Sequence, residues 1–210
     1  MLGCYFSNNH ANILGGAIYW QGINSSLTDS TFINNTANQA GAIQCDCPNA
    51  ILTDSTFIGN TADNSGAVRC GGGVYNIIIS GCNFTGNKAN VGGAGAVSWG
   101  GDNGTLNKST FIDNTATANG GAIRWGGVNG TMIDCNFVNN KWTNSYTKSN
   151  GIYVYSNLTI NGGNGIVDLN IVGTLSGIHI IALNNQTYFC PPNENINFTT
   201  KICKNKNHFC

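Results

Sequence analysis

The fold is decided by residues 106–125, which read LNKSTFIDNTATANGGAIRW. This stretch is one of six similar copies, because its Phe recurs every 25 to 27 residues, at Phe6, Phe32, Phe57, Phe84, Phe111 and Phe137. An Asn follows each Phe by three residues, at Asn9, Asn35, Asn60, Asn87, Asn114 and Asn140. A Gly-Ala-Ile or Gly-Ala-Val motif then follows in five copies, and the sixth is the weaker Asn150-Gly151-Ile152. Self-similarity at a fixed period is the signature of a repeat architecture.

The apolar residues within each copy alternate over short runs that Asn, Gly and Asp interrupt. Such runs are typical of short strands joined by tight bends. Three strands and three bends in each copy predict a parallel β-helix, an all-β solenoid of six to seven coils with 25–27 residues in each coil. Like residues then form columns along the stack, about 4.8 Å apart.

Three columns have a clear structural interpretation. The Phe column is expected to point inward as an aromatic stack, and the Asn column to form an amide ladder that binds turn backbone. The column three residues before Phe is rich in Gly and Asp, which tolerate a left-handed backbone, so we expect a bend there. Its members are Gly3, Asp29, Asp54, Gly81, Lys108 and Asp134.

The Gly-Ala-Ile strand supplies the candidate binding residues. Two residues past its Ile we expect an inward column of Trp20, Cys45, Cys70, Trp99, Trp125 and Val154. The residue between the Ile and this inward position must then point outward. This predicts an exposed stripe of Tyr19, Gln44, Arg69, Ser98, Arg124 and Tyr153. Aromatic and Arg side chains suit carbohydrate or protein surfaces, and ordinary solvated surface is the simpler alternative.

Composition excludes several function classes. The 210 residues include 35 Asn and 29 Gly, only 9% are charged, and the net charge is zero. Nine basic residues on a neutral chain argue against nucleic acid as a partner. No run of 18 apolar residues is present, so we expect no membrane insertion by this segment. We also expect no cofactor and no metal site.

The pattern divides the chain into two parts. Residues 1–183 form the repeat domain, and residues 184–210, with three cysteines and several lysines, form a tail or cap fragment. Because Met1 already occupies a repeat column, we expect a fragment of a longer solenoid without its N-terminal cap or signal peptide.

Nine cysteines are an odd number, so at least one has no partner within the chain. Cys4, Cys82 and Cys135 share one inward column but lie in non-adjacent coils, too far apart for a disulfide, and we expect free thiols. Cys45 and Cys70 lie in adjacent coils and could be bridged. A disulfide among Cys190, Cys203 and Cys210 is open as well.

The sequence gives little support for a catalytic site. Asp29 and Asp54 share a column in adjacent coils and could form an acid/base pair, but a bend explains them better, since Gly3 and Gly81 share that column. Coil length barely varies, so nothing builds the groove walls of a polysaccharide lyase or hydrolase. A carbohydrate-active β-helix enzyme, of the polysaccharide lyase or hydrolase type, is the alternative function. We predict instead that the protein is not an enzyme.

Asn-x-Ser/Thr acceptor sites for N-glycosylation occur at nine positions. The high Asn, Ser and Thr content inflates that number. Asn103 and Asn129 fall in predicted loops and are the better candidates, whereas Asn34 lies beside the amide ladder.

The paired motifs Gly-Gly-Ala-Ile and Phe-x-x-Asn resemble the repeats of the chlamydial polymorphic outer-membrane proteins. The fuller string, Leu106 to Ala116 followed by Gly120 to Trp125, resembles the adhesin-like surface proteins of methanogenic archaea. This resemblance covers residues 1–157 and implies a right-handed β-helix, an extracellular or cell-surface location and a role in adhesion. Carbohydrate or protein on another cell would be the partner. A passive spacer within a longer surface protein is a further hypothesis.

Overall fold

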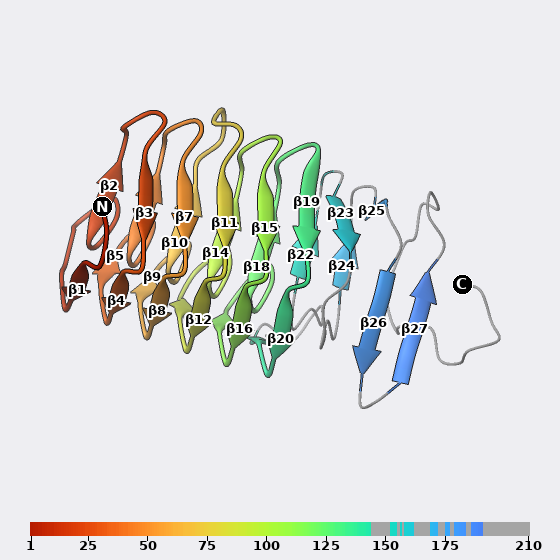
Figure 1. Ribbon diagram of the computed structural model, residues 1–210. Helices are drawn as coiled ribbons and strands as arrows, with labels where there is room; N and C mark the ends of the chain where they lie inside the picture. Colours follow the sequence, from red (N-terminus) through yellow and green to blue (C-terminus); the bar gives the residue numbers. More distant parts are fainter. Residues whose placement is uncertain are drawn as a thin grey trace.

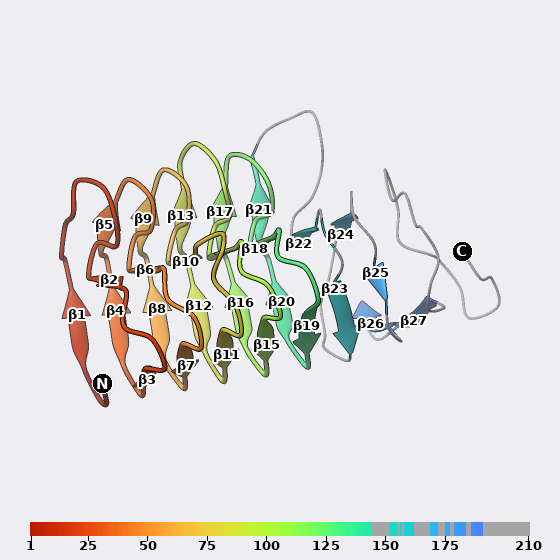
Figure 2. The ribbon, with the colours of Figure 1, turned by 90° about the horizontal axis from the view of Figure 1, so that it is seen from above.

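The computed structural model describes residues 1–143, 152–154, 156, 158–161, 169–171, 175–176, 179–183 and 186–190. It is a right-handed parallel β-solenoid of about six turns, and no helix occurs in these residues. Figure 1 shows the coils stacked along one axis, and Figure 2 shows their strands in rows from above. The predicted fold class is confirmed.

Four parallel sheets run along the stack, and we call them sheets A to D. Sheet A contains β3 (Ser26–Thr28), β7 (Ile51–Thr53), β11 (Ile78–Ser80), β15 (Thr105–Asn107), β19 (Gly130–Ile133), β23 (Leu158–Asn161) and β25 (Leu175–Ser176). Sheet B contains β1 (Tyr5–Ser7), β4 (Thr31–Ile33), β8 (Thr56–Ile58), β12 (Asn83–Thr85), β16 (Thr110–Ile112) and β20 (Asn136–Val138).

Sheet C contains β5 (Thr36–Ala37), β9 (Thr61–Ala62), β13 (Lys88–Ala89), β17 (Thr115–Ala116) and β21 (Lys141–Trp142). Sheet D contains β2 (Ile18–Trp20), β6 (Ile43–Cys45), β10 (Val68–Cys70), β14 (Val97–Trp99), β18 (Ile123–Trp125), β22 (Ile152–Val154) and β24 (Leu169–Ile171). At the far end β26 (His179–Leu183) and β27 (Gln186–Cys190) pair antiparallel. The predicted tail from residue 191 onward lies outside the described residues.

A complete coil therefore has four strands, and the prediction of three was wrong. The additional strand is the Thr-Ala pair of sheet C, which is only two residues long. So short a strand shows no alternation in the sequence. Its Ala faces the core, with Ala89 and Ala116 fully buried.

The predicted columns are present in register. The Phe rings stack face to face with centroids 4.8 to 4.9 Å apart, and Phe32, Phe57, Phe84 and Phe111 are fully buried. In the column three residues before Phe, every φ lies between 47° and 64°, which confirms the predicted left-handed bend. Lys108, the one misfit of that column, adopts this backbone too.

The Gly of the Gly-Ala-Ile motif is required by the distance between coils. A Cβ on Gly41 would lie 2.1 Å from the carbonyl oxygen of Gly66 in the next coil, and Gly16, Gly66 and Gly95 meet the same obstacle. Any larger side chain would push adjacent coils apart. This motif therefore sets how closely sheet D can stack.

Candidate binding surface on sheet D

The six predicted binding residues lie in one continuous column on the outer side of sheet D. Backbone pairing places them in consecutive register from β2 to β22, in the order Tyr19, Gln44, Arg69, Ser98, Arg124 and Tyr153. We call this column the sheet D stripe. The residues on either side of it in each strand point into the core, as expected, since Trp99, Trp125 and Val154 are fully buried.

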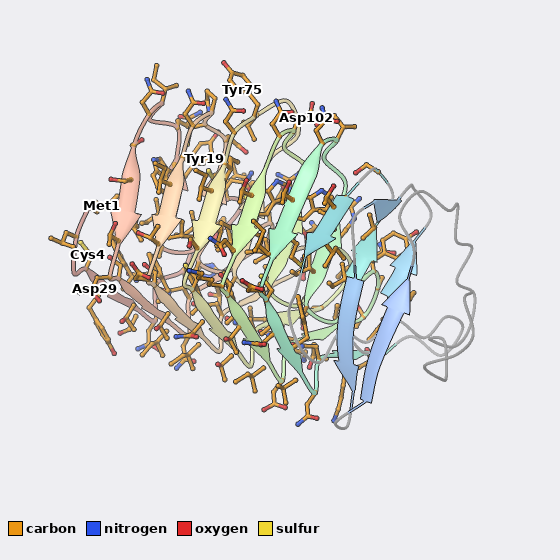
Figure 3. The ribbon with its side chains drawn as sticks, turned by 45° about the vertical axis from the view of Figure 1, so that its right-hand side comes forward. Met1, Cys4, Tyr19, Asp29, Tyr75 and Asp102 are labelled. Carbon is orange, nitrogen blue, oxygen red and sulfur yellow. The ribbon has the colours of Figure 1, made fainter. Side chains whose placement is uncertain are left out.

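The prediction that the whole stripe is exposed was wrong. Tyr19 is 45% exposed, but Gln44 is fully buried and Ser98 is 4% exposed. Arg69, Arg124 and Tyr153 are half-buried. Tyr19 is labelled in Figure 3.

A glycine in the segment before β14 accounts for the burial of Ser98. A Cβ on Gly93 would lie 2.9 Å from Ser98 Oγ. This connecting segment therefore lies close against the stripe at Ser98. A period of two in the sequence gives the direction of a side chain, but it cannot show that a neighbouring turn covers it.

Asp46 adds a carboxylate to one end of the stripe, which the repeat pattern did not predict. Gln44 Nε2 donates a hydrogen bond to Asp46 Oδ1 at 2.5 Å. The pKa of Tyr19 is raised, first by loss of solvation and then by the Asp46 carboxylate. Since Asp46 follows Gln44 by two residues, the Gln-x-Asp spacing was the available signal.

Two buried oxygen atoms on the stripe lack a hydrogen-bond partner among the described residues: Gln44 Oε1 and Ser98 Oγ. Buried polar atoms are almost always paired, so each exception calls for an explanation. An ordered internal water would supply the missing bonds.

The middle of the stripe is basic. Arg69 and Arg124 lie two coils apart, about 9.6 Å along the stack at the usual strand spacing. The pKa of Arg124 is lowered, mainly by burial and then by the charge of Arg69. Two nearby guanidinium groups attract an anion, and their planar forks match carboxylate or sulfate.

The remaining predicted candidates have structural roles. Asp29, Asp54 and Asp134 occupy the left-handed bend, with φ between 50° and 51°. Figure 3 labels Asp29 beside the first coil. His10 Nδ1 lies 2.9 Å from Thr36 Oγ1, in a bond that joins the first two coils.

Six cysteines in the described part of the chain are free thiols, including Cys4, Cys82 and Cys135 as expected. The bridge left open between Cys45 and Cys70 is absent, and Cys45 Sγ instead lies 3.5 Å from Cys47 Sγ. Burial raises the pKa of Cys45 and of Cys70 well above the usual range. The side chains of Cys190, Cys203 and Cys210 lie outside the described residues.

Two features are absent from the described residues. No group of three or more His, Cys, Asp or Glu is placed to hold a metal ion. No helix there has the length and apolar character needed to cross a membrane.

Comparison with known proteins finds one family. Residues 3–19, 29–46 and 108–124 match the Chlamydia polymorphic membrane protein repeat. Each match begins at the left-handed bend before the Phe strand and ends in or just after the sheet D strand. No curated protein and no solved structure matches the chain. The chain thus contains repeats of the polymorphic membrane protein type, and the likeness to archaeal adhesin-like proteins stays a prediction.

Proposed function

We propose that this chain is a non-catalytic segment of an extracellular adhesin, which contacts carbohydrate or protein on another cell through the sheet D stripe. The observation that carries the proposal is the register of sheet D, which aligns two Tyr and two Arg side chains in one line, with the buried Gln44 and Ser98 between them. The match to repeats of a surface-protein family supports the location.

The chemistry of the stripe favours an acidic glycan as the ligand. Arg69 and Arg124 would bind carboxylate or sulfate groups, and Tyr19 and Tyr153 at the two ends would pack against sugar rings.

The proposal is tested by removing the two central charges. The double variant Arg69→Gln, Arg124→Gln should lose at least about tenfold in half-maximal adhesion to cells or to immobilised acidic glycans. Each charge-assisted hydrogen bond contributes roughly 1.5–3 kcal/mol, and tenfold corresponds to about 1.4 kcal/mol. Adding Tyr19→Ala and Tyr153→Ala should deepen the loss.

The matched control is Lys88→Gln, Lys141→Gln, which removes the same charge from exposed positions on sheet C. This control should adhere like the parent chain, and circular dichroism should show all variants folded. If the Arg variant adheres as well as the Lys control, the stripe is not the binding surface, and the passive spacer becomes the better interpretation. Turnover of a polysaccharide by the chain would support the enzyme alternative instead.

A further inference from the structure

A second asparagine column runs along the outside of the solenoid, in the turn between sheets D and A. Its members are Asn24, Asn49, Asn76, Asn103 and Asn129, and all have φ between 52° and 57°. Asn49 is half-buried and the other four are exposed. Their amides bond along the stack: Asn49 Nδ2 donates to Asn24 Oδ1 at 2.7 Å, and Asn129 Nδ2 donates to Asn103 Oδ1 at 3.3 Å. We call it the outer Asn column.

Figure 3 shows the edge of the molecule at which this column lies. The labelled Tyr75 and Asp102, which precede Asn76 and Asn103 in sequence, project from the same turns at the top of the view. Asp102 Oδ1 accepts a hydrogen bond from the backbone nitrogen of Val128 at 3.0 Å and ties adjacent turns together. The column therefore sits on an edge where a hydrogen bond joins adjacent turns, apart from the sheet D stripe.

The residues two positions after these asparagines also form a column, on the outer side of sheet A. They pair in register in the order Ser26, Ile51, Ile78, Thr105 and Thr131. Three of the five asparagines are thus followed by a hydroxyl two residues later, and these three form Asn-x-Ser/Thr sites at Asn24, Asn103 and Asn129. Asn49 and Asn76, which are followed two residues later by Ile, do not form such sites.

The residue between amide and hydroxyl turns toward the core, so the two sequon groups lie on the solvent side together. Gly104 and Gly130, the middle residues at Asn103 and Asn129, are buried. A Cβ there would lie 2.4 Å from Trp99 and 2.3 Å from Trp125. Contact with the core Trp therefore restricts the middle residue to Gly at these two sites. The left-handed bend leaves the side chains of Asn103 and Asn129 exposed to solvent.

The acceptor sequence at Asn107 lacks this geometry. Asn107 Oδ1 is buried, and Ser109, which supplies the hydroxyl, is fully buried. Ser109 Oγ donates to the Asn107 carbonyl oxygen at 2.9 Å. At Asn34 the hydroxyl is engaged as well, because Thr36 Oγ1 bonds His10. A glycan on Asn107 would have to displace buried structure.

We propose that Asn24, Asn103 and Asn129 are sites of N-linked glycosylation. In this transfer Nδ2 forms a bond to the anomeric carbon of an oligosaccharide carried on a polyprenyl phosphate or diphosphate. The bond from that carbon to the phosphate oxygen breaks, the lipid phosphate leaves, and a proton from Nδ2 passes to a base. The proposal relies on the extracellular location in the proposed function, but not on adhesion.

The column supplies its own test variants. Thr105→Ile and Thr131→Ile remove the sites at Asn103 and Asn129 while keeping both Asn, and Ile already stands at this position in β7 and β11. Ile78→Thr creates a site at Asn76 in the same geometry. The full chain is secreted from a eukaryotic cell behind a leader sequence, and folded secreted protein is analysed by peptide mass spectrometry after enzymatic glycan release in heavy-oxygen water.

The parent chain should carry glycans at Asn103, Asn129 and Asn24 and none at Asn107. Each Thr→Ile variant should lose glycan at its own Asn only, and Ile78→Thr should gain glycan at Asn76. Unmodified Asn24, Asn103 and Asn129 in folded secreted protein would overturn the proposal, as would occupancy of Asn107 equal to that of Asn103. Occupancy is measured without any adhesion assay, so glycans with no adhesion would count against the adhesin alone, and adhesion without glycans against the glycosylation alone.

Discussion

At the scale of the residue, three of the coils balance a large side chain against a small one. Where the inward column of sheet D holds Trp99 or Trp125, the coil has Gly five residues later, and the indole ring fills that space. Where the column holds Cys45, the coil instead has Ala50, which is buried in the same position. The volume of the core is therefore matched within these three coils, as close packing requires.

This balance predicts the effect of adding one methyl group. Gly104→Ala should lower the free energy of unfolding by about 1–3 kcal/mol, the usual cost of overpacking a core, because its Cβ would lie 2.4 Å from Trp99 Nε1. Urea denaturation followed by circular dichroism measures the change.

Two comparisons isolate the cause. Gly72→Ala, where a new Cβ meets nothing within 4 Å, should change stability by no more than about 0.5 kcal/mol. In a Trp99→Cys background, which imitates the coil of Cys45, Gly104→Ala should cost less than in the parent. An equal cost in both backgrounds would show that Trp99 is not the obstacle.

At the scale of the element, the inner Asn column acts as a continuous hydrogen-bonded ladder. Asn87 Oδ1 accepts from the backbone nitrogen and from Nδ2 of Asn60, both at 3.0 Å. Asn87 Nδ2 donates to Asn114 Oδ1 at 2.9 Å and to the Phe57 carbonyl oxygen at 3.0 Å. Every amide hydrogen and oxygen of this buried side chain is thus used, as the sequence predicted.

Removing one rung should therefore be costly. Asn87→Ala leaves the backbone N–H and one amide N–H of Asn60 without partners in the interior, and each such group costs roughly 1–3 kcal/mol. We expect a loss of at least about 2 kcal/mol, measured by chemical denaturation.

The control for this ladder is Asn90→Ala, since Asn90 is exposed three residues further on. It should change stability by less than about 0.5 kcal/mol. A loss below about 1 kcal/mol for Asn87→Ala would mean that water satisfies the broken ladder, and that the amides are not what holds the turn.

At the scale of the whole molecule, buried thiols couple the stability of the stack to alkaline pH. Burial raises the pKa of Cys82 from 9.0 to about 12 and that of Cys135 to about 11. In the unfolded chain both thiols ionise near pH 9, whereas in the folded chain they keep their protons. The stabilisation is complete below pH 9 and is lost as the pH rises toward the folded pKa values.

Under reducing conditions the free energy of unfolding should therefore fall by about 1–2 kcal/mol for each of these thiols between about pH 8 and pH 10.5. Denaturant titrations across that range measure it. Cys82→Ser, Cys135→Ser should make the pH dependence shallower, because hydroxyls do not ionise there. Ser already occupies this column at Ser30, Ser55 and Ser109. An unchanged slope in the double variant would assign the pH dependence to other groups.

Alignment of the repeats predicted the structure of those columns in which one residue type, or one conformational preference, recurs. The Phe stack, the inner Asn ladder and the left-handed bend at Asp29 and Asp54 were all predictable, because each repeats a residue type with a distinct conformational or packing role. The fourth strand was not predictable, since Thr-Ala is too short to alternate. The burial of Ser98 was not predictable either, because it arises from the segment that precedes its strand.

The sequence by itself determined the repeat, its period and the direction of each column, because every coil must place the same residue types against their copies one strand spacing away. It also determined that the molecule is held together by neutral ladders, since like charges stacked at this distance would repel. Only the tertiary structure decided which outward side chains reach solvent. Exposure depends on how the connecting turns fold back over each strand, and that is set by close approaches such as Gly93 to Ser98. The outer Asn column likewise depends on the stacking of the coils, which brings the Asn amides of adjacent turns within hydrogen-bonding distance.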